Sequence, residues 1–220
     1  MPYRAIRGSD PHAAGLAAAG VRGCRITPVS GAPTRARLLA VAMRLFWEKG
    51  YQSTSIADIL RESETNSGSL YHFFATKQDL LIGVLDEYRD GIGPMLLMPA
   101  WESVEDPLER VFALLAGYRR LLVESDFRLG CPIGNIALEV AEPDPALRQR
   151  LVENFEAWTD AVAECVAQSG ALPPGVDARR VARFALTTME GGVMLARTYR
   201  DIAPFDDAIE SFRRFLNSGG

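Results

Sequence analysis

Histidine and cysteine are scarce in this 220-residue sequence. It contains only two histidines, His12 and His72, and three cysteines, Cys24, Cys131 and Cys165. Two histidines give almost no material for a catalytic triad or a histidine-rich metal centre. The cysteines are odd in number and lack a paired metal-ligand spacing, so they suggest neither a disulfide framework nor a zinc site. We therefore expect no metal, no cofactor and no catalytic residue.

Long apolar runs are missing as well. No run approaches the roughly 18 residues that a membrane-spanning helix needs. Residues 13–21 form a short, alanine-rich and only weakly hydrophobic segment, which is a poor match to a signal peptide. With 48% hydrophobic and 24% charged residues, the composition is typical of a globular chain with one large or two modest domains. These observations predict a cytoplasmic protein without a membrane partner.

The charges are unevenly distributed along the chain. Residues 1–80 carry ten Lys or Arg against six Asp or Glu, whereas residues 81–220 carry fourteen against twenty-two. The net charge of -4 therefore hides a basic first part and an acidic remainder. A basic excess of this size is compatible with a polyanionic partner, but it does not indicate nucleic-acid binding unaided.

Apolar residues recur at three- and four-residue steps from residue 33 onward, which is typical of amphipathic helices. The spacing predicts a first helix capped by Thr34 and ended by Gly50, and a short second helix after Thr54. A third helix opens at Asn66 and a fourth begins at Lys77. No segment alternates with period two for long enough to form a strand, so we predict an all-α protein.

The later part of the chain has the same helical period after a predicted break at residues 91–94. Helices are expected around residues 108–122, from Asp144 onward, over residues 177–199 and over residues 205–216. Phe184 and Phe215 are expected to face the interior in the last two. Residues 1–33 lack any period and contain scattered Gly, Pro and Arg, so we interpret them as a disordered arm.

Residues 54–77 have the layout of a helix-turn-helix, with two short helices separated by a polar break. The second helix has a predicted apolar face and a polar face, and Gly68 would let its backbone approach a duplex closely. The apolar face comprises Leu70, Phe73 and Phe74, and the polar face comprises Ser67, Ser69, Tyr71 and His72. Such a polar face suits the base edges of the major groove.

The sequences LFWEKGY at residues 45–51 and GSLYHFFATKQDL at residues 68–80 resemble the DNA-binding domain of the TetR family of bacterial transcriptional regulators. The resemblance implies two sets of contacts with double-stranded DNA. Those that hold the phosphate backbone would come from Thr54, Ser55, Tyr71, His72 and Lys77. Those that face bases would come from Thr65, Asn66, Ser67 and Ser69. One departure is Glu64, where the family usually has a glycine that favours a left-handed turn.

Each proposed contact has a plainer alternative. Tyr71 could be a surface aromatic and Lys77 a charge at a helix start, while His72 could contact a phosphate or simply face solvent. The resemblance divides the chain into an arm (1–33), a three-helix helix-turn-helix domain (34–80) and a larger helical domain for effector binding and dimerisation (81–220).

The C-terminal part is expected to pair two copies of the chain through its last two helices. Two helices from each subunit can form a four-helix bundle, and Gly191 and Gly192 would permit close backbone approach. The alternative is that these helices pack only within one chain and that the glycines mark a kink.

Residues 130–139, GCPIGNIALE, resemble the Gly-Cys-x-x-Gly-Asn segment of one branch of the family, whose effector domains sense small molecules or oxidants. Cys131 is thus a candidate sensor thiol. A reactive thiol needs a lowered pKa, and Cys131 precedes a predicted helix N-terminus, with Arg128 close in sequence. The alternative is a buried apolar cysteine, which is the interpretation that we give to Cys165.

A ligand pocket can be assembled from aromatic and apolar side chains with few polar groups, although each member could equally be plain core. The apolar candidates are Phe112, Leu115, Tyr118, Phe155, Trp158, Phe184 and Met189. The polar candidates are Asn135, Thr187, Thr188 and Glu190.

The sequence therefore predicts a ligand-responsive transcriptional repressor that binds a palindromic operator as a homodimer and leaves it when a small-molecule effector binds; activation in place of repression stays open. The alternative is a small-molecule or thiol-redox sensor whose helix-turn-helix no longer binds DNA. An enzyme has little support, because Glu139 and Glu190 have no accompanying nucleophile-base pair.

Overall fold

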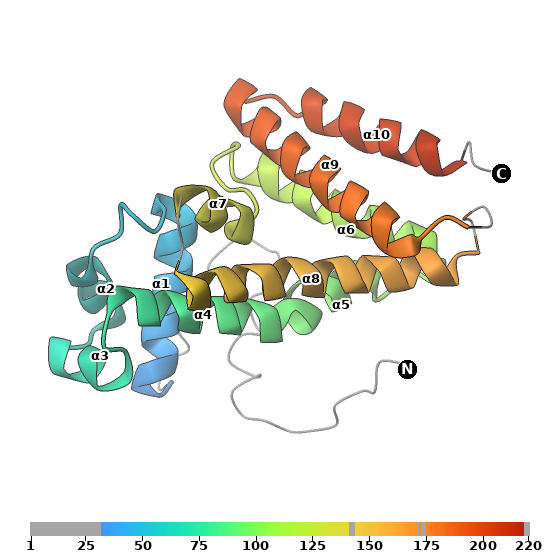
Figure 1. The fold of residues 1–220 in the computed structure, drawn as a ribbon. Coiled ribbons are helices and arrows are strands. Elements are labelled where there is room, and N and C mark those ends of the chain that lie inside the picture. The colour runs from blue at the N-terminus through green and yellow to red at the C-terminus, as the bar shows by residue number, and fades with distance from the viewer. Residues whose placement is uncertain (1–31, 141–143, 171, 173–174, 218–220) are drawn as a thin grey trace.

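The computed structural model describes residues 32–140, 144–170, 172 and 175–217 (Figure 1). Within these ranges every regular element is a helix and none is a strand, which confirms the predicted all-α class. No helix in the described ranges is long and apolar enough to cross a bilayer. The predicted arm lies outside the described residues up to residue 31, and so do His12 and Cys24.

Four helices form the first unit, namely α1 (Thr34–Lys49), α2 (Ile56–Ser63), α3 (Ser67–Phe73) and α4 (Lys77–Ile92). Gly50 ends α1 as predicted, but Thr34 lies inside the helix and Pro33 occupies the cap position without a side-chain hydrogen bond. Side chains that are essentially inaccessible to solvent hold these helices together. They include Leu38, Leu45, Phe46, Ile59, Leu70 and Leu80.

The predicted break at residues 91–94 does not occur, because the backbone stays helical there. α4 continues into a π-helix, η2 (Gly93–Leu97), and a short α5 (Met98–Trp101). Pro94 lies at the start of η2. The wide i→i+5 turn accommodates a proline, which has no N–H to donate to an α-helical hydrogen bond. Glycine and proline therefore change the type of helix here without ending it.

The second unit contains α6 (Pro107–Glu124), α7 (Pro132–Glu139), α8 (Pro145–Gln168), α9 (Ala178–Tyr199) and α10 (Ala203–Asn217). Figure 1 shows α2 and α3 at one end of the molecule and α9 and α10 toward the other, with α4 and α8 running between them. α10 packs on α9, where a Cβ at Gly192 would lie 3.3 Å from the Cα of Phe205. Gly192 thus serves a close helix crossing within the chain.

Polar contacts fix α4 against α8. Arg89 pairs with Glu153 at 2.8 Å, and Arg150 pairs with Asp86 at 2.8 Å. The buried Asn154 amide donates to the backbone oxygen of Leu85 at 2.9 Å. α4 therefore connects the helix-turn-helix rigidly to the second unit.

Three phenylalanines predicted to face the interior are exposed instead: Phe73 is 41% exposed, Phe184 47% and Phe215 50%. Phe73 is the last residue of α3, and the extended backbone at Phe74 turns that ring into the core in its place. Phe184 stacks edge to face on the outside of α9 and α10, with ring centroids 5.5 Å from Phe212 and 5.4 Å from Phe215. These two helices therefore carry an aromatic outer face.

Candidate DNA-binding surface and effector site

α3 lies at one end of the molecule (Figure 1). The Asn66 side chain caps the helix by accepting a 2.8 Å hydrogen bond from the Ser69 amide, and Leu70 anchors it with no exposed surface. The predicted polar residues Ser67, Gly68, Tyr71 and His72 are exposed, with Tyr71 at 54%, and Ser69 is half-buried. The short helix therefore keeps its polar edge free for a partner.

The turn before α3 keeps its left-handed residue although a glutamate occupies it. Glu64 has φ 52° and ψ 44°, and its amide donates to the carbonyls of Arg61 and Leu60. The Thr65 amide donates to the Leu60 carbonyl at 3.1 Å. The Thr65 hydroxyl lies 2.8 Å from that of Ser63, which is buried. The geometry is that of a helix C-terminus whose left-handed residue is usually glycine.

The residues predicted to hold phosphates differ in their exposure. Thr54 is 1% exposed and its hydroxyl donates to the Gly50 carbonyl at 2.7 Å, so it fixes the end of α1 and does not reach the surface. Its assignment as a phosphate contact is therefore wrong. Ser55 is exposed and caps α2. Lys77 is half-buried, and its Nζ donates to the Tyr51 carbonyl at 2.6 Å.

The basic residues around α2 are largely neutralised by neighbouring carboxylates. Arg44 and Lys49 both pair with Glu62, the latter at 3.8 Å. Arg61 pairs with Asp58 at 2.5 Å. The surface beside α3 is consequently less basic than the residue count of this region suggests.

α7 connects the helix-turn-helix with the second unit. The Trp47 indole donates to the Gly130 carbonyl at 2.7 Å just before α7. At the other end, the Glu139 carboxylate accepts a 2.9 Å hydrogen bond from the Gln52 amide in the α1–α2 corner. Burial lowers the pKa of Lys77, and Glu139 opposes that shift electrostatically. Sequence reasoning missed this bridge, because no local signal pairs residues that are 87 positions apart.

Cys131 caps α7 from a buried position. It is 5% exposed, and its Sγ accepts a 3.4 Å hydrogen bond from the Gly134 amide. Burial, and next the Glu190 carboxyl, raise the pKa of the thiol well above its ordinary value. Arg128 does not compensate, because its Nε donates to the Ser125 carbonyl at 3.0 Å. Cys131 lies at the helix start that was predicted, but its burial and raised pKa favour the alternative of a buried cysteine over that of a reactive thiolate.

The buried side chains of Tyr118 and Trp158 and the half-buried Glu190 lie around Cys131. Tyr118 is 7% exposed, and burial is the first cause that raises the pKa of its phenol well above the ordinary value. Glu190 lies against α7, where a Cβ at Gly134 would be 2.9 Å from its carboxyl carbon. Trp158 is 4% exposed. Tyr118, Trp158 and Glu190 from the predicted pocket therefore come together with the candidate sensor Cys131 where α6, α7, α8 and α9 meet.

Several other predicted pocket residues have surroundings of their own. The Asn135 side chain binds Arg197, whose Nη1 donates to its Oδ1 at 2.7 Å. Phe155 and Thr188 are half-buried on α8 and α9. Phe184 is exposed and does not line an interior pocket. Phe112 packs under the Arg213 guanidinium, with 3.6 Å between its ring centroid and the Arg213 Cζ.

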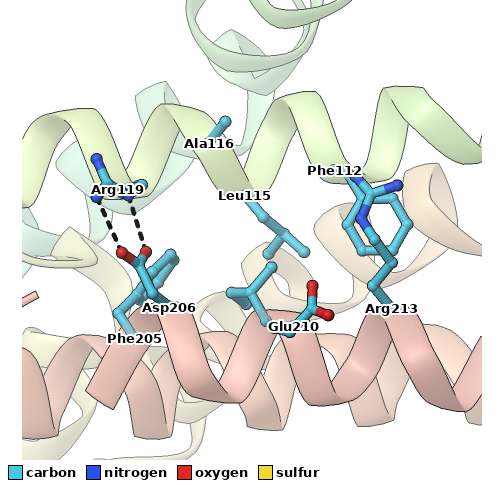
Figure 2. A pocket seen from close by; sticks show the side chains of 9 residues that line it. Phe112, Leu115, Ala116, Arg119, Phe205, Asp206, Glu210 and Arg213 are labelled. Atoms are coloured by element: carbon cyan, nitrogen blue, oxygen red, sulfur yellow. Dashed lines mark hydrogen bonds and ion pairs between the residues drawn. The ribbon is translucent and has the colours of Figure 1, made fainter. Parts of the chain in front are cut away.

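Phe112 lines a surface groove of about 320 Å³ between α6 and α10 (Figure 2). The charged groups at its rim are engaged with one another. Arg119 forms two hydrogen bonds to Asp206, at 2.8 and 2.9 Å. Arg213 pairs with Glu109 at 2.6 Å. The groove therefore offers apolar surface with few free polar groups.

Comparisons with known proteins cover both units. Residues 38–84 match the family described as bacterial regulatory proteins, tetR family. Residues 107–211 match the family described as transcriptional regulator LmrA/YxaF-like, C-terminal domain. An HTH-type transcriptional regulator of Mycobacterium tuberculosis (strain H37Rv) is 32% identical over 188 residues, which cover 83% of this chain and 93% of the relative.

Two further proteins illustrate the range of similarity. The HTH-type transcriptional repressor DhaR of Mycobacterium sp. (strain GP1) is 24% identical over 177 residues, or 79% of this chain and 87% of the relative. A crystal structure of a TetR transcriptional regulator from Chloroflexus aurantiacus superposes with a TM-score of 0.70 at 29% identity, covering 83% of this chain and 93% of that one.

Proposed function

The chain belongs to the TetR family of bacterial regulatory proteins, and we propose that it is a ligand-responsive transcriptional repressor without enzymatic activity. It binds a palindromic operator as a homodimer and leaves it when a small-molecule effector binds the C-terminal unit. One observation carries the proposal: α3 exposes a polar edge while the buried Leu70 fixes its orientation. A polar edge of this kind can read bases in the major groove.

The proposed DNA contacts are those that the resemblance implies, without the buried Thr54. Tyr71 and His72 contact phosphates beside α3, Ser55 does so at the start of α2, and Lys77 does so with the donors that Tyr51 leaves free. The base-reading positions at the start of α3 are Thr65, Asn66, Ser67 and Ser69. Phosphate contacts make affinity fall with salt, and base contacts supply the sequence preference.

Gly68 gives this proposal a sharp test. It is exposed on α3, and a Cβ there would meet only Asn66 Oδ1, at 3.3 Å. Gly68→Ala should change the free energy of unfolding by no more than roughly 0.5–1 kcal/mol, because the better helix propensity of alanine is opposed by its close contact with the Asn66 oxygen that caps the helix. It should nevertheless weaken operator binding, because the added methyl group separates the helix backbone from the duplex.

The experiment selects bound fragments from random duplex DNA and measures their affinity by fluorescence anisotropy at several salt concentrations. Gly117→Ala is the matched control, because Gly117 lies in α6 with open space around its Cβ position. Unchanged DNA affinity of Gly68→Ala, or no retained DNA at low salt, would contradict the proposal. Ligand binding without DNA binding would favour the sensor alternative.

Dimerisation is proposed through the outer face of α9 and α10. Besides Phe215, this face exposes four large apolar or aromatic side chains: Phe184, Met194, Leu195 and Tyr199. A Cβ at Gly191 would meet nothing within 4 Å, so a partner helix could approach closely there. Two copies of these helices would form a four-helix bundle. Such a dimer would need to space its α3 helices about 34–36 Å apart, or a multiple of that.

Effector control is proposed to pass through α7. The start of this helix touches Glu190 in the buried cluster, and its end holds the α1–α2 corner through Glu139 and Gln52. A ligand that displaces α7 would alter how the helix-turn-helix is held. A coupling of about 1–3 kcal/mol changes operator affinity roughly 5- to 150-fold, which suffices for a switch.

A further inference from the structure

The cluster of Tyr118, Cys131, Trp158 and Glu190 leaves two buried polar atoms without a partner among the described residues. They are Nε1 of Trp158, which can only donate, and Oε1 of Glu190. The Trp158 indole faces the Tyr118 phenol and lowers its pKa, which opposes the effect of burial. Nε1 of Trp158 nevertheless has no acceptor in hydrogen-bonding geometry. Trp158 and Glu190 both act on the Tyr118 phenol, so both adjoin it. Buried polar groups in folded proteins are almost always paired, so an unpaired donor and an unpaired acceptor that adjoin the same side chain indicate a missing third group.

The acidic groups of the cluster also lack a cation. Tyr118, Cys131 and Glu190 are all acids, and burial is the first cause of a raised pKa for each. No ion pair to Glu190 occurs in the described part of the chain. Arg197, one of the arginines on the same helix, directs both terminal nitrogens of its guanidinium elsewhere, because they donate to Asn135 and to the Arg128 carbonyl. A buried carboxylate without a counter-charge is costly, and a cationic ligand would remove that cost.

These two shortages define complementary ligand chemistry. Oε1 of Glu190 needs a donor, preferably a charged one, whereas Nε1 of Trp158 needs an acceptor. An alcohol oxygen close to an ammonium group supplies both within one small molecule. The Trp158 and Tyr118 rings add surfaces on which an ammonium group is favoured.

We propose that the effector of this protein is a cationic amine that carries a neighbouring oxygen, with the ammonium group on Glu190 and the oxygen accepting from Trp158. This inference rests on the proposed function and names the ligand class for its effector site. Glu190 also lies against Gly134 at the start of α7, so the ligand would act on the helix that holds the α1–α2 corner.

Three probes of nearly equal size separate the two contacts. Phenylethanolamine carries both groups, 1-phenyl-1,2-ethanediol replaces the amine with a hydroxyl, and 2-phenylethylamine lacks the oxygen. Isothermal titration calorimetry at pH 7.5 should give the tightest binding for phenylethanolamine. Losing the charge should weaken binding roughly 30-fold or more, and losing the oxygen about 5-fold or more.

Two variants assign these preferences to residues. Glu190→Gln should remove the preference for phenylethanolamine over the diol, and Trp158→Phe should remove its preference over 2-phenylethylamine. Thermal unfolding gives an independent readout, since a ligand at 100 times its Kd raises the folded-to-unfolded ratio about 100-fold. If one variant fails to fold, the other variant and the three probes on the wild-type protein still test the proposed ligand class.

The inference is overturned if phenylethanolamine does not bind, if the diol binds as tightly, or if Glu190→Gln keeps the preference for the amine. Operator binding by the ligand-free wild-type protein is measured separately. Operator binding without amine binding rejects this ligand class and leaves the regulator proposal intact. Amine binding without operator binding rejects the regulator proposal instead.

Discussion

Replacing Glu64 with glycine should stabilise the protein. An L-residue in the left-handed region costs about 1–2 kcal/mol relative to glycine, and Glu64 lies there with φ 52° and ψ 44°. Glycine also makes the unfolded chain more flexible, which lowers the free energy of unfolding by roughly 0.4–1 kcal/mol. The backbone hydrogen bond from the Glu64 amide to Leu60 does not depend on the side chain and adds no further change. The difference between the two contributions is a net gain in stability of about 0.5–1 kcal/mol. For a chain of this length the Tm should rise by about 1–4 °C.

Glu64→Gln separates the strain from the charge. Glutamine keeps the backbone strain and removes the carboxylate, so its Tm should match that of the wild-type protein. Both variants should bind the operator roughly twofold more tightly at low salt, because each removes a negative charge near phosphates. Differential scanning calorimetry and fluorescence anisotropy measure the two effects.

Three results would refute this reasoning. A lower Tm for Glu64→Gly would show that the side chain, and not its absence, stabilises the turn. Equal gains in Tm for both variants would assign the effect to charge. Different operator affinities for the two variants would mean that glycine changes the orientation of α3.

Glu139→Ala removes the acceptor of the Gln52 backbone amide. Hydrogen exchange at that amide should quicken, and the free energy of unfolding should fall by about 1 kcal/mol. An unchanged exchange rate would count against the contact between Glu139 and Gln52. Gly191→Leu should convert the dimer to a monomer in sedimentation velocity, whereas Gly117→Leu should not, and a dimeric Gly191→Leu would reject this interface. Native Cys131 should resist iodoacetamide at pH 8 far better than in urea, as followed by mass spectrometry. Since burial raises its folded-state pKa above the ordinary 9.0, stability from this group should be lost above about pH 9, and Cys131→Ser should flatten that loss.

The predictable parts of the fold are those with short-range causes. Asn66 and Thr76 precede helices that they cap, and the amides that they accept from lie three residues further on. The apolar spacing around Leu70 places one face inward by geometry alone. These signals need no knowledge of the rest of the chain, and the polar edge of α3 followed from them.

The parts that could not be predicted depend on distant neighbours. Thr54 lies in a segment whose polar composition predicts an exposed surface, but its hydroxyl is buried against the end of α1. Phe184 fits an amphipathic stripe, and only the position of α10 decides that its ring stays outside. The bridge between Glu139 and Gln52 arises from packing between units. Periodicity carries no information on such pairs.

Some of the departures from ordinary protein architecture fall at the three places where partners are proposed. Stable domains bury apolar side chains and pair buried polar atoms, and exceptions tend to occur at functional sites. Phe184 and Tyr199 are exposed where a second copy is proposed to pack, and Oε1 of Glu190 is unpaired where a ligand is proposed to bind. Glu64 is strained beside the helix that is proposed to read DNA. Each departure lowers the free energy of unfolding of the free chain, and each proposed partner binds the folded state only. The free energy of unfolding should therefore rise when effector, operator or second subunit is added.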